Sequence, residues 1–325
     1  MMELIKINLQ LFAEMNTNIT GDSGLSVENK TFYDMTLIDE AQANLVHDQF
    51  GQKRPIPKNG GKKIEFRKFA ALPKALTALT EGVTPDGKKL EVTAIEAEVS
   101  QYGDYIVQSD VLELTSIDNT IVEATKILGR QAGLTLDTIT RNVLQSGTNV
   151  FYCPKGDGTA VTSRTALDAT SKLNVATIKK AVAFLKKNNA PKIDGSYVAI
   201  VHPYAAHDLM SDPEWIDAHK YAQPENLYEG EIGKIAGVRF VETSEAAVID
   251  GVYCTLLMGA NAYGVTEITG GGLQTIIKQK GSAGTADPLD QRSSIGWKAM
   301  KTAEILIEAY LCRIESKSDF DIENN

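Results

Sequence analysis

The sequence predicts an α+β fold, because three kinds of segment follow one another along its 325 residues. Segment 53–108 is rich in basic and turn residues and contains two short runs that alternate apolar and polar side chains, which is typical of strands. A proline-free apolar stripe over about 118–145 predicts one long helix. From about 150 onward, helix-like and strand-like patterns alternate. The composition is that of a globular protein, with 43% hydrophobic and 23% charged residues.

Residues 1–52 are expected to form an N-terminal arm. The first 14 residues are mostly apolar, but Lys6, Asn8 and Gln10 interrupt the run, which makes it a poor secretory signal. No later segment reaches the roughly 18 consecutive apolar residues that a membrane helix needs. We interpret the first residues as a short apolar arm that docks on another surface.

The net charge of −9 is distributed unevenly along the chain. Between Lys53 and Lys89 there are ten basic residues against three acidic ones, which gives +7 there and −16 elsewhere. Two predicted strands, Ile64–Phe69 and Leu90–Val99, border this turn-rich stretch, and a phase slip at Ile95 suggests a bulge. A basic hairpin on an acidic body can bind another copy of that body, although a solvated hairpin without a partner is the simpler alternative.

The long helix is expected to begin at a cap formed by Ser116 or Asp118 and to end at Gly147. About 28 residues at 1.5 Å each give a rod roughly 42 Å long. Gly129 and Gly133 lie one turn apart on it, which indicates either the close approach of another backbone or mere tolerance of glycine.

After a loop at 153–158 the chain is expected to alternate helices and strands. Asn174 should cap a helix that turns Val175, Ile178, Val182 and Leu185 inward. A short helical stretch, Ala205–Met210, precedes a turn at Asp212–Trp215. The predicted strands are Tyr197–Val201, two within Gly230–Val241, Val252–Met258, Leu273–Lys280 and Ala303–Glu315, after which an acidic tail, 317–325, leaves the ordered part.

Signals for catalysis are weak throughout the chain. The stretch Gly82–Lys89 resembles a phosphate-binding loop, but Lys89 replaces the required hydroxyl and a strand pattern follows. His202, His207 and Asp208 could bind a divalent metal, but their spacing matches no known ligand frame. Cys153, Cys254 and Cys312 are too far apart in sequence to indicate a disulfide framework, and a reducing compartment suits them best. We therefore predict no catalytic residue, no cofactor and no metal.

Three motifs and the order of the elements are distinctive. Asp287-Pro288-Leu289-Asp290-Gln291-Arg292, followed by Gly296-Trp297-Lys298 and the strand Ile305–Glu315, form the first motif. Gly233–Val238 and Asn8–Ala13 are the second and third. Together they resemble the major capsid proteins of tailed bacteriophages: the ending of one branch of that family, its axial-domain hairpin, and the start of many head proteins in phages of Gram-positive hosts.

The resemblance implies the fold of those capsid proteins. Residues 1–52 would be the arm, 53–108 an extended loop lying across an adjacent subunit, 109–149 a peripheral domain with its spine helix, 150–269 an axial domain, 270–316 peripheral-domain strands and 317–325 the tail. Lys62, Lys63, Arg67 and Lys68 are the candidate inter-subunit contacts. No covalent cross-link between subunits is predicted.

The resemblance also implies a structural function. The chain would self-assemble into the hexamers and pentamers of an icosahedral shell around double-stranded DNA, with weak, non-specific DNA contact and no membrane. Implied partners are a separate scaffolding protein, a portal and a decoration protein. The implied location is the virion, and the host cytoplasm during assembly. Two alternatives stay open: an encapsulin-type nanocompartment shell, and a metal-dependent soluble enzyme using His202, His207 and Asp208.

Overall fold

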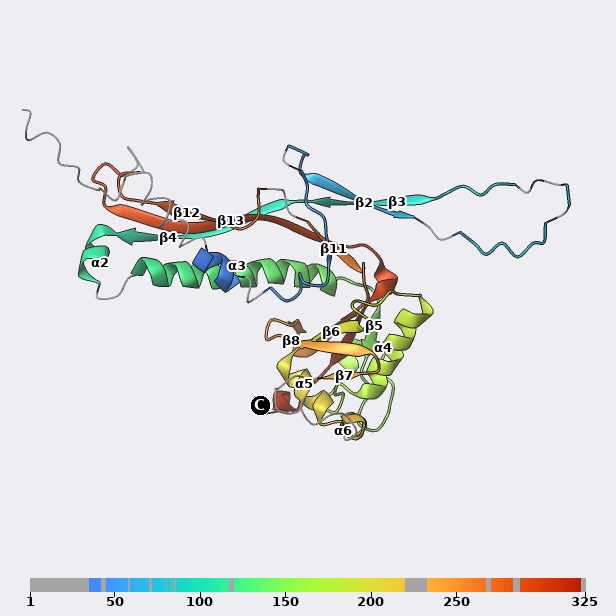
Figure 1. Cartoon of the computed structure of the whole chain (residues 1–325). Helices are drawn as coiled ribbons and strands as arrows, with labels where there is room; N and C mark the ends of the chain where they lie inside the picture. The colour runs from blue at the N-terminus through green and yellow to red at the C-terminus, as the bar shows by residue number, and fades with distance from the viewer. Residues whose placement is uncertain are drawn as a thin grey trace, which may run out of the picture.

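The computed structural model describes residues 35–41, 45–57, 59–69, 72–79, 81–82, 84, 86–116, 120–219, 233–266, 270–282 and 287–322. The predicted leader Asn8–Ala13 lies outside these residues. The molecule is elongated: a long sheet lies over a long helix, a hairpin extends beyond one end, and a compact α/β unit lies below (Figure 1).

The long sheet is organised around strand β13 (Arg292–Ile305), which pairs with all but one of the other four strands. Strand β4 (Ser100–Ser109) runs antiparallel to it over ten residue pairs, from Arg292 opposite Ser109 to Lys301 opposite Ser100. Strands β12 (Gln274–Lys278) and β11 (Tyr263–Thr266) both pair antiparallel with β13, β12 with residues 294–298 and β11 with residues 302–305. The short β1 (Gln52–Lys53) pairs parallel with β11. Strand β4 was not predicted from the sequence, because its partner lies almost 200 residues away.

The predicted long helix is confirmed as α3, Thr120–Gln145. Its stripe of Ala124, Leu128, Ala132 and Leu136 packs against residues of β13, including Ile295 and Trp297. The helix does not begin at a Ser116 cap: Ser116 instead ends a separate short helix, α2 (Asp110–Thr115), whose N-cap is Ser109.

The two glycines of α3 allow another backbone to approach closely, which is one of the two possibilities left open by the sequence. Helical residues 35–41 cross α3 there, with Leu37 and Ala41 fully buried. A Cβ atom at Gly129 would lie 2.8 Å from the Leu37 carbonyl oxygen, and one at Gly133 would lie 2.5 Å from that of Ala41. The backbone of residues 35–41 therefore occupies the space that side chains at these positions would need.

A buried polar network joins the segment after this crossing to the helix and the long sheet. The Nδ1 of His47 lies 2.6 Å from Oδ2 of Asp137 on α3, and both side chains are fully buried. The neighbouring Asp48 accepts a hydrogen bond from Thr140 at 2.6 Å and pairs with Lys301 of β13. The Tyr263 hydroxyl of β11 donates to the His47 carbonyl oxygen. Three elements far apart in sequence are thus fixed by two consecutive residues.

The compact unit is built on a seven-stranded sheet in the order β5-β14-β10-β6-β8-β7, with β9 paired to β10. Its strands are β5 (Val150–Tyr152), β14 (Leu311–Ser316), β10 (Val252–Met258), β6 (Tyr197–Val201), β8 (Val238–Glu242), β7 (Lys234–Ile235) and β9 (Val248–Ile249). Helices α4 (Val175–Lys187), α5 (Pro203–Met210) and α6 (Pro213–His219) pack with it (Figure 1). The α4 prediction is confirmed: Asn174 caps the helix by accepting from the Thr177 N–H, and the four expected apolar residues are buried.

The predicted single strand Ala303–Glu315 is wrong, because the chain changes sheets within it. Strand β13 ends at Ile305 in the long sheet, a 3₁₀ turn follows at Glu308–Tyr310, and β14 enters the compact unit. Strand β11 likewise belongs to the long sheet, so 150–269 and 270–316 each contribute to both sheets. Sequence periodicity gives the strands but not which sheet each one joins.

The C-terminal tail does not leave the fold after Ser316, contrary to expectation. The Lys317 N–H donates to the Ser171 carbonyl at 2.9 Å, and Lys172 forms an ion pair with Asp319. The Phe320 ring stacks on Tyr204 with centroids 4.4 Å apart. The tail is therefore docked on the compact unit at least as far as Phe320.

The predicted hairpin is formed by β2 (Lys63–Phe69) and β3 (Val92–Glu98). Its register runs without interruption from Lys63 opposite Glu98 to Phe69 opposite Val92, so the bulge suggested at Ile95 is wrong. Ile95 lies opposite Phe66, and Val92 is exposed. The slip in the apolar pattern arises because apolar residues also lie on the open face of the hairpin. The backbone itself is regular there.

Replacing Gly133 by Ala is expected to destabilise the protein, although alanine favours a helix by about 1 kcal/mol. The added methyl would meet the Ala41 backbone, which can move only with residues 35–41, and overpacking of this kind costs about 1–3 kcal/mol. Urea unfolding followed by circular dichroism measures the change. The control, Asn142→Ala, adds helix propensity at an exposed position of the same helix and should be neutral or stabilising. Equal changes in the free energy of unfolding of the two variants would contradict the close crossing of residues 35–41 over α3.

Replacing Asp48 by Ala is expected to lower the free energy of unfolding by about 3–5 kcal/mol, since it leaves the Lys301 charge buried without its carboxylate. Removing both charges in Asp48→Leu with Lys301→Met should cost much less, because no unpaired charge remains. Urea unfolding of both single variants and the double variant gives the coupling energy. Additive losses would show that the pair does not act as a unit.

Candidate assembly surfaces

The four predicted contact residues lie at the base of the hairpin but do not form a uniformly basic surface. Lys62 immediately precedes β2, and Lys63 and Arg67 lie on its exposed face. Lys63 is 3.5 Å from Glu96 and Arg67 is 3.5 Å from Glu65, with all four side chains largely exposed. Lys68 lies in β2, and its side chain is outside the described part of the structure.

Pairing of β3 with β2 also changes the charge balance of the hairpin. Strand β3 and the residues before it bring Glu91, Glu96 and Glu98, so 53–98 carries ten bases against six acids, or +4. Exposed pairs of this kind contribute little to stability, at most about 1 kcal/mol each. The hairpin remains basic, but less so than the sequence segment 53–89 indicates.

The hairpin is anchored to the long sheet by an aromatic side chain. Phe66 is 4% exposed, and its ring lies where a side chain of residue 264 would be, 2.8 Å from an ideal Cβ at Gly264 of β11. Ala97 and Val99 are buried at the same base, and the Val99 N–H donates to the Lys62 carbonyl at 2.9 Å. Only the base of the hairpin is thus supported by the rest of the chain.

Beyond this base the connection between β2 and β3 exposes apolar side chains. Leu76 is 85% exposed and Leu79 77%, and Leu72, Leu90 and Val92 are at least half exposed. The connection extends away from the remainder of the molecule (Figure 1). An extended segment with apolar residues in water is typical of a surface that another chain covers. The charges of this segment were evident in the sequence, whereas the exposure of its leucines was not predicted.

A second exposed apolar surface lies at the opposite end of the long sheet, around α2 (Figure 1). Val111, Leu112 and Leu114 of α2 are exposed, Leu114 to 81%, and Tyr105 and Val107 of β4 are more than half exposed. This end surface was not predicted. The available signal was the run Val111-Leu112-Glu113-Leu114, which is too apolar for the start of a solvated helix.

The residues proposed for a metal site have structural roles. His202 is the N-cap of α5, where its Nδ1 accepts from the Tyr204 N–H at 3.2 Å, and its ring lies 4.8 Å from that of Tyr253. His207 is exposed, and its Nδ1 is 3.7 Å from Asp208 Oδ1. Within the described residues no group of three His, Cys, Asp or Glu side chains could hold a metal ion. The geometry gives the enzyme alternative no support.

The other weak signals are equally structural. Strand β3 follows Gly82–Lys89, so the described residues there lack the helix that aims N–H groups at a phosphate. The three cysteines are free and buried, and burial raises the pKa of Cys153 and Cys312 to about 12 and that of Cys254 to about 11. Thiols of this kind are poor nucleophiles. None of the helices in the described ranges combines the length and apolarity needed to cross a membrane.

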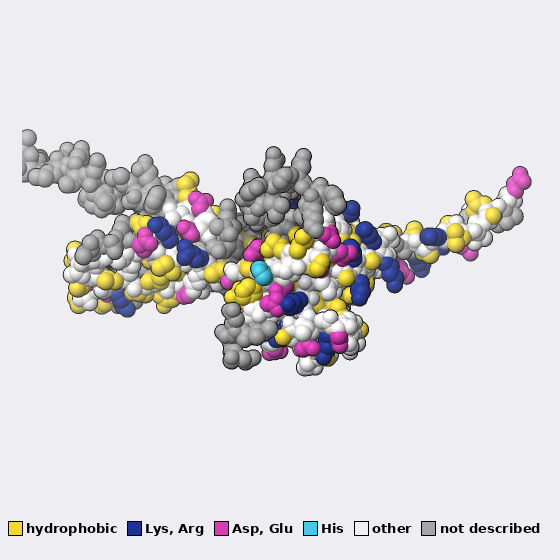
Figure 2. All heavy atoms as spheres, turned by 90° about the horizontal axis from the view of Figure 1, so that it is seen from below, with side chains coloured by type: hydrophobic (Ala, Val, Ile, Leu, Met, Phe, Trp, Pro, Cys, Tyr) yellow, Lys and Arg dark blue, Asp and Glu magenta, His cyan; other side chains and the backbone are white. Residues whose placement is uncertain are grey.

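Viewed from below, the described surface carries basic and acidic side chains interspersed over the compact unit and the base of the hairpin (Figure 2). No face visible there is uniformly of one charge. Of the two ends of the molecule, the hairpin connection combines exposed leucines with bases, and the end surface at α2 combines exposed apolar residues with Asp110 and Glu113.

Comparison with known proteins identifies the family to which this arrangement belongs. A sequence model of the family described as "Phage capsid protein" matches residues 92–307, more than half of the chain. No curated protein sequence matches.

Several solved structures share the fold. The capsid of cyanophage P-SCSP1u has 12% identity and a TM-score of 0.65, over 84% of this chain and 88% of its own. The capsid of cyanophage Pam1 has 14% identity and a TM-score of 0.65, over 86% and 92%. A virus-like particle from Pyrococcus furiosus has 10% identity and a TM-score of 0.52, over 88% and 99%.

Asp208 should make the stability of the protein pH-dependent. Burial raises the pKa of this carboxyl above its ordinary value, opposed by a hydrogen bond from Ser318. A folded pKa above the unfolded one means that stability falls as pH rises from about 4, the unfolded value, through the folded one. Asp208→Asn is therefore expected to be more stable than the wild type at pH 7, and the difference should vanish near pH 3. Urea midpoints across this range test it, with the exposed Asp250→Asn as the matched control.

Proposed function

Because this chain belongs to the phage capsid protein family, we propose that it is the major subunit of an icosahedral head that encloses the double-stranded DNA of a tailed phage. Its place is in the virion. Copies form hexamers and pentamers, and the number of copies in the head follows from how these rings close into a shell. The family membership carries this proposal, and the two exposed apolar surfaces at opposite ends of one rigid body support it.

The hairpin connection lies across an adjacent copy in this proposal. Its leucines are covered there, and Lys62, Lys63, Arg67 and Lys68 face acidic residues of the neighbour, whose chain outside 53–89 carries −16. Obligate assemblies bury more than about 2,000 Å². An excursion anchored mainly at Phe66 gains its stability from that burial.

Contacts between unlike surfaces of identical copies close into rings only if the rotation between copies divides a full turn. The hairpin connection and the end surface are such unlike surfaces. Contacts between them, or with other parts of a neighbour, are therefore heterologous. Hexamers and pentamers are two closed rings built with the same contact, and the rotation between neighbouring copies differs slightly between them.

We assign the remaining parts of the chain by the same reasoning. Residues 109–149 with α3 form the rigid spine of a peripheral domain, 150–269 provide most of an axial domain near the ring centres, and residues 1–52 are an arm. Scaffolding, portal and decoration proteins act as separate partners, assembly takes place in the host cytoplasm, and contact with DNA is weak and non-specific. The protein has no catalytic role in this proposal.

A nanocompartment shell is the second candidate, since a virus-like particle from Pyrococcus furiosus shares the fold. The two differ in content: a phage head encloses DNA, and a nanocompartment encloses a protein cargo. Particles purified from the native source that contain protein cargo and no DNA would favour this candidate.

The first experiment is to express the chain alone and to measure sedimentation velocity, with negative-stain electron microscopy of any fast fraction. Closed shells or tubes are expected, either alone or when a candidate scaffolding protein is co-expressed. A chain that remains a monomer under both conditions would overturn the proposal.

Charge reversal of the hairpin base is expected to block assembly. The variant changes Lys62, Lys63, Arg67 and Lys68 to Glu, so its hairpin would repel the acidic neighbour. Lys62, Lys63 and Arg67 are exposed, so their replacement should not disturb folding. The variant should sediment as a folded small species with an unchanged circular dichroism spectrum.

The matched control reverses four exposed lysines of α4, namely Lys179, Lys180, Lys186 and Lys187, which changes the total charge equally. Shells from the control and none from the hairpin variant would support the contact. Normal shells from the hairpin variant would remove these four residues from the interface.

A further inference from the structure

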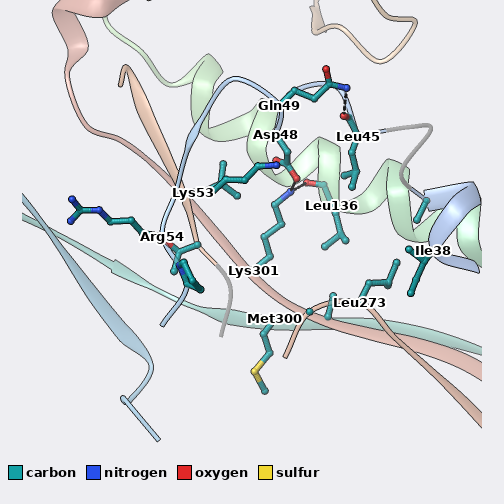
Figure 3. Close-up of a pocket in the computed structure, with 16 residues that line it drawn as sticks. Ile38, Leu45, Asp48, Gln49, Lys53, Arg54, Leu136, Leu273, Met300 and Lys301 are labelled. Atoms are coloured by element: carbon teal, nitrogen blue, oxygen red, sulfur yellow. Dashed lines mark hydrogen bonds and ion pairs between the residues drawn. The ribbon is translucent and has the colours of Figure 1, made fainter. Parts of the chain in front are cut away.

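An open cavity of about 400 Å³ lies between residues 38–55, helix α3 and the long sheet (Figure 3). Its apolar wall is formed by Ile38 and Leu45 on one side and by Leu136, Leu273 and Met300 on the other. A cavity of about 150 Å³ holds one benzene ring, so this one has room for two or three apolar side chains. A cavity of this size with such a wall is suited to an apolar segment.

The opening of the cavity carries a net positive charge. Among the charged residues that line the cavity, the buried Lys301 is paired with Asp48, the single carboxylate, which also accepts from Thr140. Lys53 and Arg54 add two further positive charges. In Figure 3, Lys53 extends toward Asp48 and Arg54 points outward. Lys53 and Arg54 are exposed. A suitable occupant is therefore apolar with an acidic residue beside it.

This chain contains such a segment next to the cavity. Helical residues 35–41 line the cavity through Ile38 and Ala41, and 34 residues precede them in the sequence. Among those 34, the first 13 residues are rich in apolar side chains, and the group formed by Leu9, Leu11, Phe12 and Ala13 is followed directly by Glu14. The 23 residues that follow Phe12, up to Met35, would span roughly 26 Å as a flexible chain, which is enough to reach a cavity that begins at Ile38.

We propose that the leader, residues 9–14, docks in this cavity of its own chain, with its apolar side chains against Leu136 and Leu273 and Glu14 facing Lys53 or Arg54. A tethered segment binds with a high effective concentration, which favours the leader of the same chain over that of another copy. The proposal concerns the unassembled subunit and does not depend on shell formation.

The test is cysteine cross-linking in the full-length, unassembled chain. Phe12→Cys combined with Leu273→Cys is oxidised mildly, and the linked peptides are identified by mass spectrometry. A disulfide needs Cα atoms within about 7 Å, so it forms only if the leader enters the cavity. The native cysteines are buried and contribute little background.

The matched control pairs Phe12→Cys with Leu76→Cys, an exposed position on the hairpin connection. We expect an intrachain link in the cavity pair and none in the control. Equal linking in both, or no link in the cavity pair, would overturn the proposal. A covalent dimer as the main product would overturn it too, since the leader would then come from a second copy.

A second measurement does not depend on cysteines. Trypsin should cleave after Lys6 on the order of tenfold faster in Leu273→Glu than in Leu289→Glu, because only the first change places a charge in the cavity. Leu289 is exposed, so the control carries the same substitution without disturbing the cavity. Equal cleavage rates in two folded variants would contradict docking.

Discussion

The buried polar contacts of His47 and Asp48 are the constraint on which the rest of the subunit depends. Asp137 and Thr140 belong to α3, Lys301 to β13, and Tyr263 to β11, so two consecutive residues hold the helix and the long sheet in one register. Apolar packing alone permits sliding between a helix and a sheet, whereas a buried ion pair is satisfied at one position only. The two ends of a body whose helix is about 39 Å long are thereby fixed relative to each other.

This rigidity explains how one subunit can leave so much apolar surface uncovered and still be folded. The side chains that hold α3 on β13 and α4 on the compact sheet are buried within the chain itself. Leu76, Leu79 and Leu114 make no contribution to that core, and they lie on segments that extend from it. The exposed leucines are therefore not needed for folding. In the proposed contact between the hairpin and a neighbour, the leucines matter as much as the lysines, because strand pairing adds three acids to the hairpin.

Local patterns were sufficient for the elements that lie within one stretch of sequence. Helix α3, the Asn174 cap and strands β6 and β10 follow from periodicity and capping chemistry, and Gly129 and Gly133 left a close backbone as one of two possibilities. Some failures were local: helix α2 was missed, and the turn predicted at Asp212–Trp215 overlaps helix α6, which begins at Pro213. Other failures were non-local. Strand β4 exists because β13 pairs with it, and the change of sheet between Ile305 and Leu311 has no periodic signature. Of the candidate surfaces, the charges were visible in the sequence, but the exposure of Leu76 or Leu114 depends on what the fold leaves uncovered.

The direction of the hairpin is set at its base, by Phe66 lying over Gly264. A side chain at residue 264 would push the ring outward and tilt both strands. Phe66 lies three residues, or about 10 Å, from the far end of β2, so a rotation of about 10° at Phe66 moves that end by about 2 Å. Displacement at the leucines beyond it is larger still. In the proposed shell, small movements at this one anchored point would let the hairpin meet the differing angles of five- and six-membered rings while the core stays unchanged.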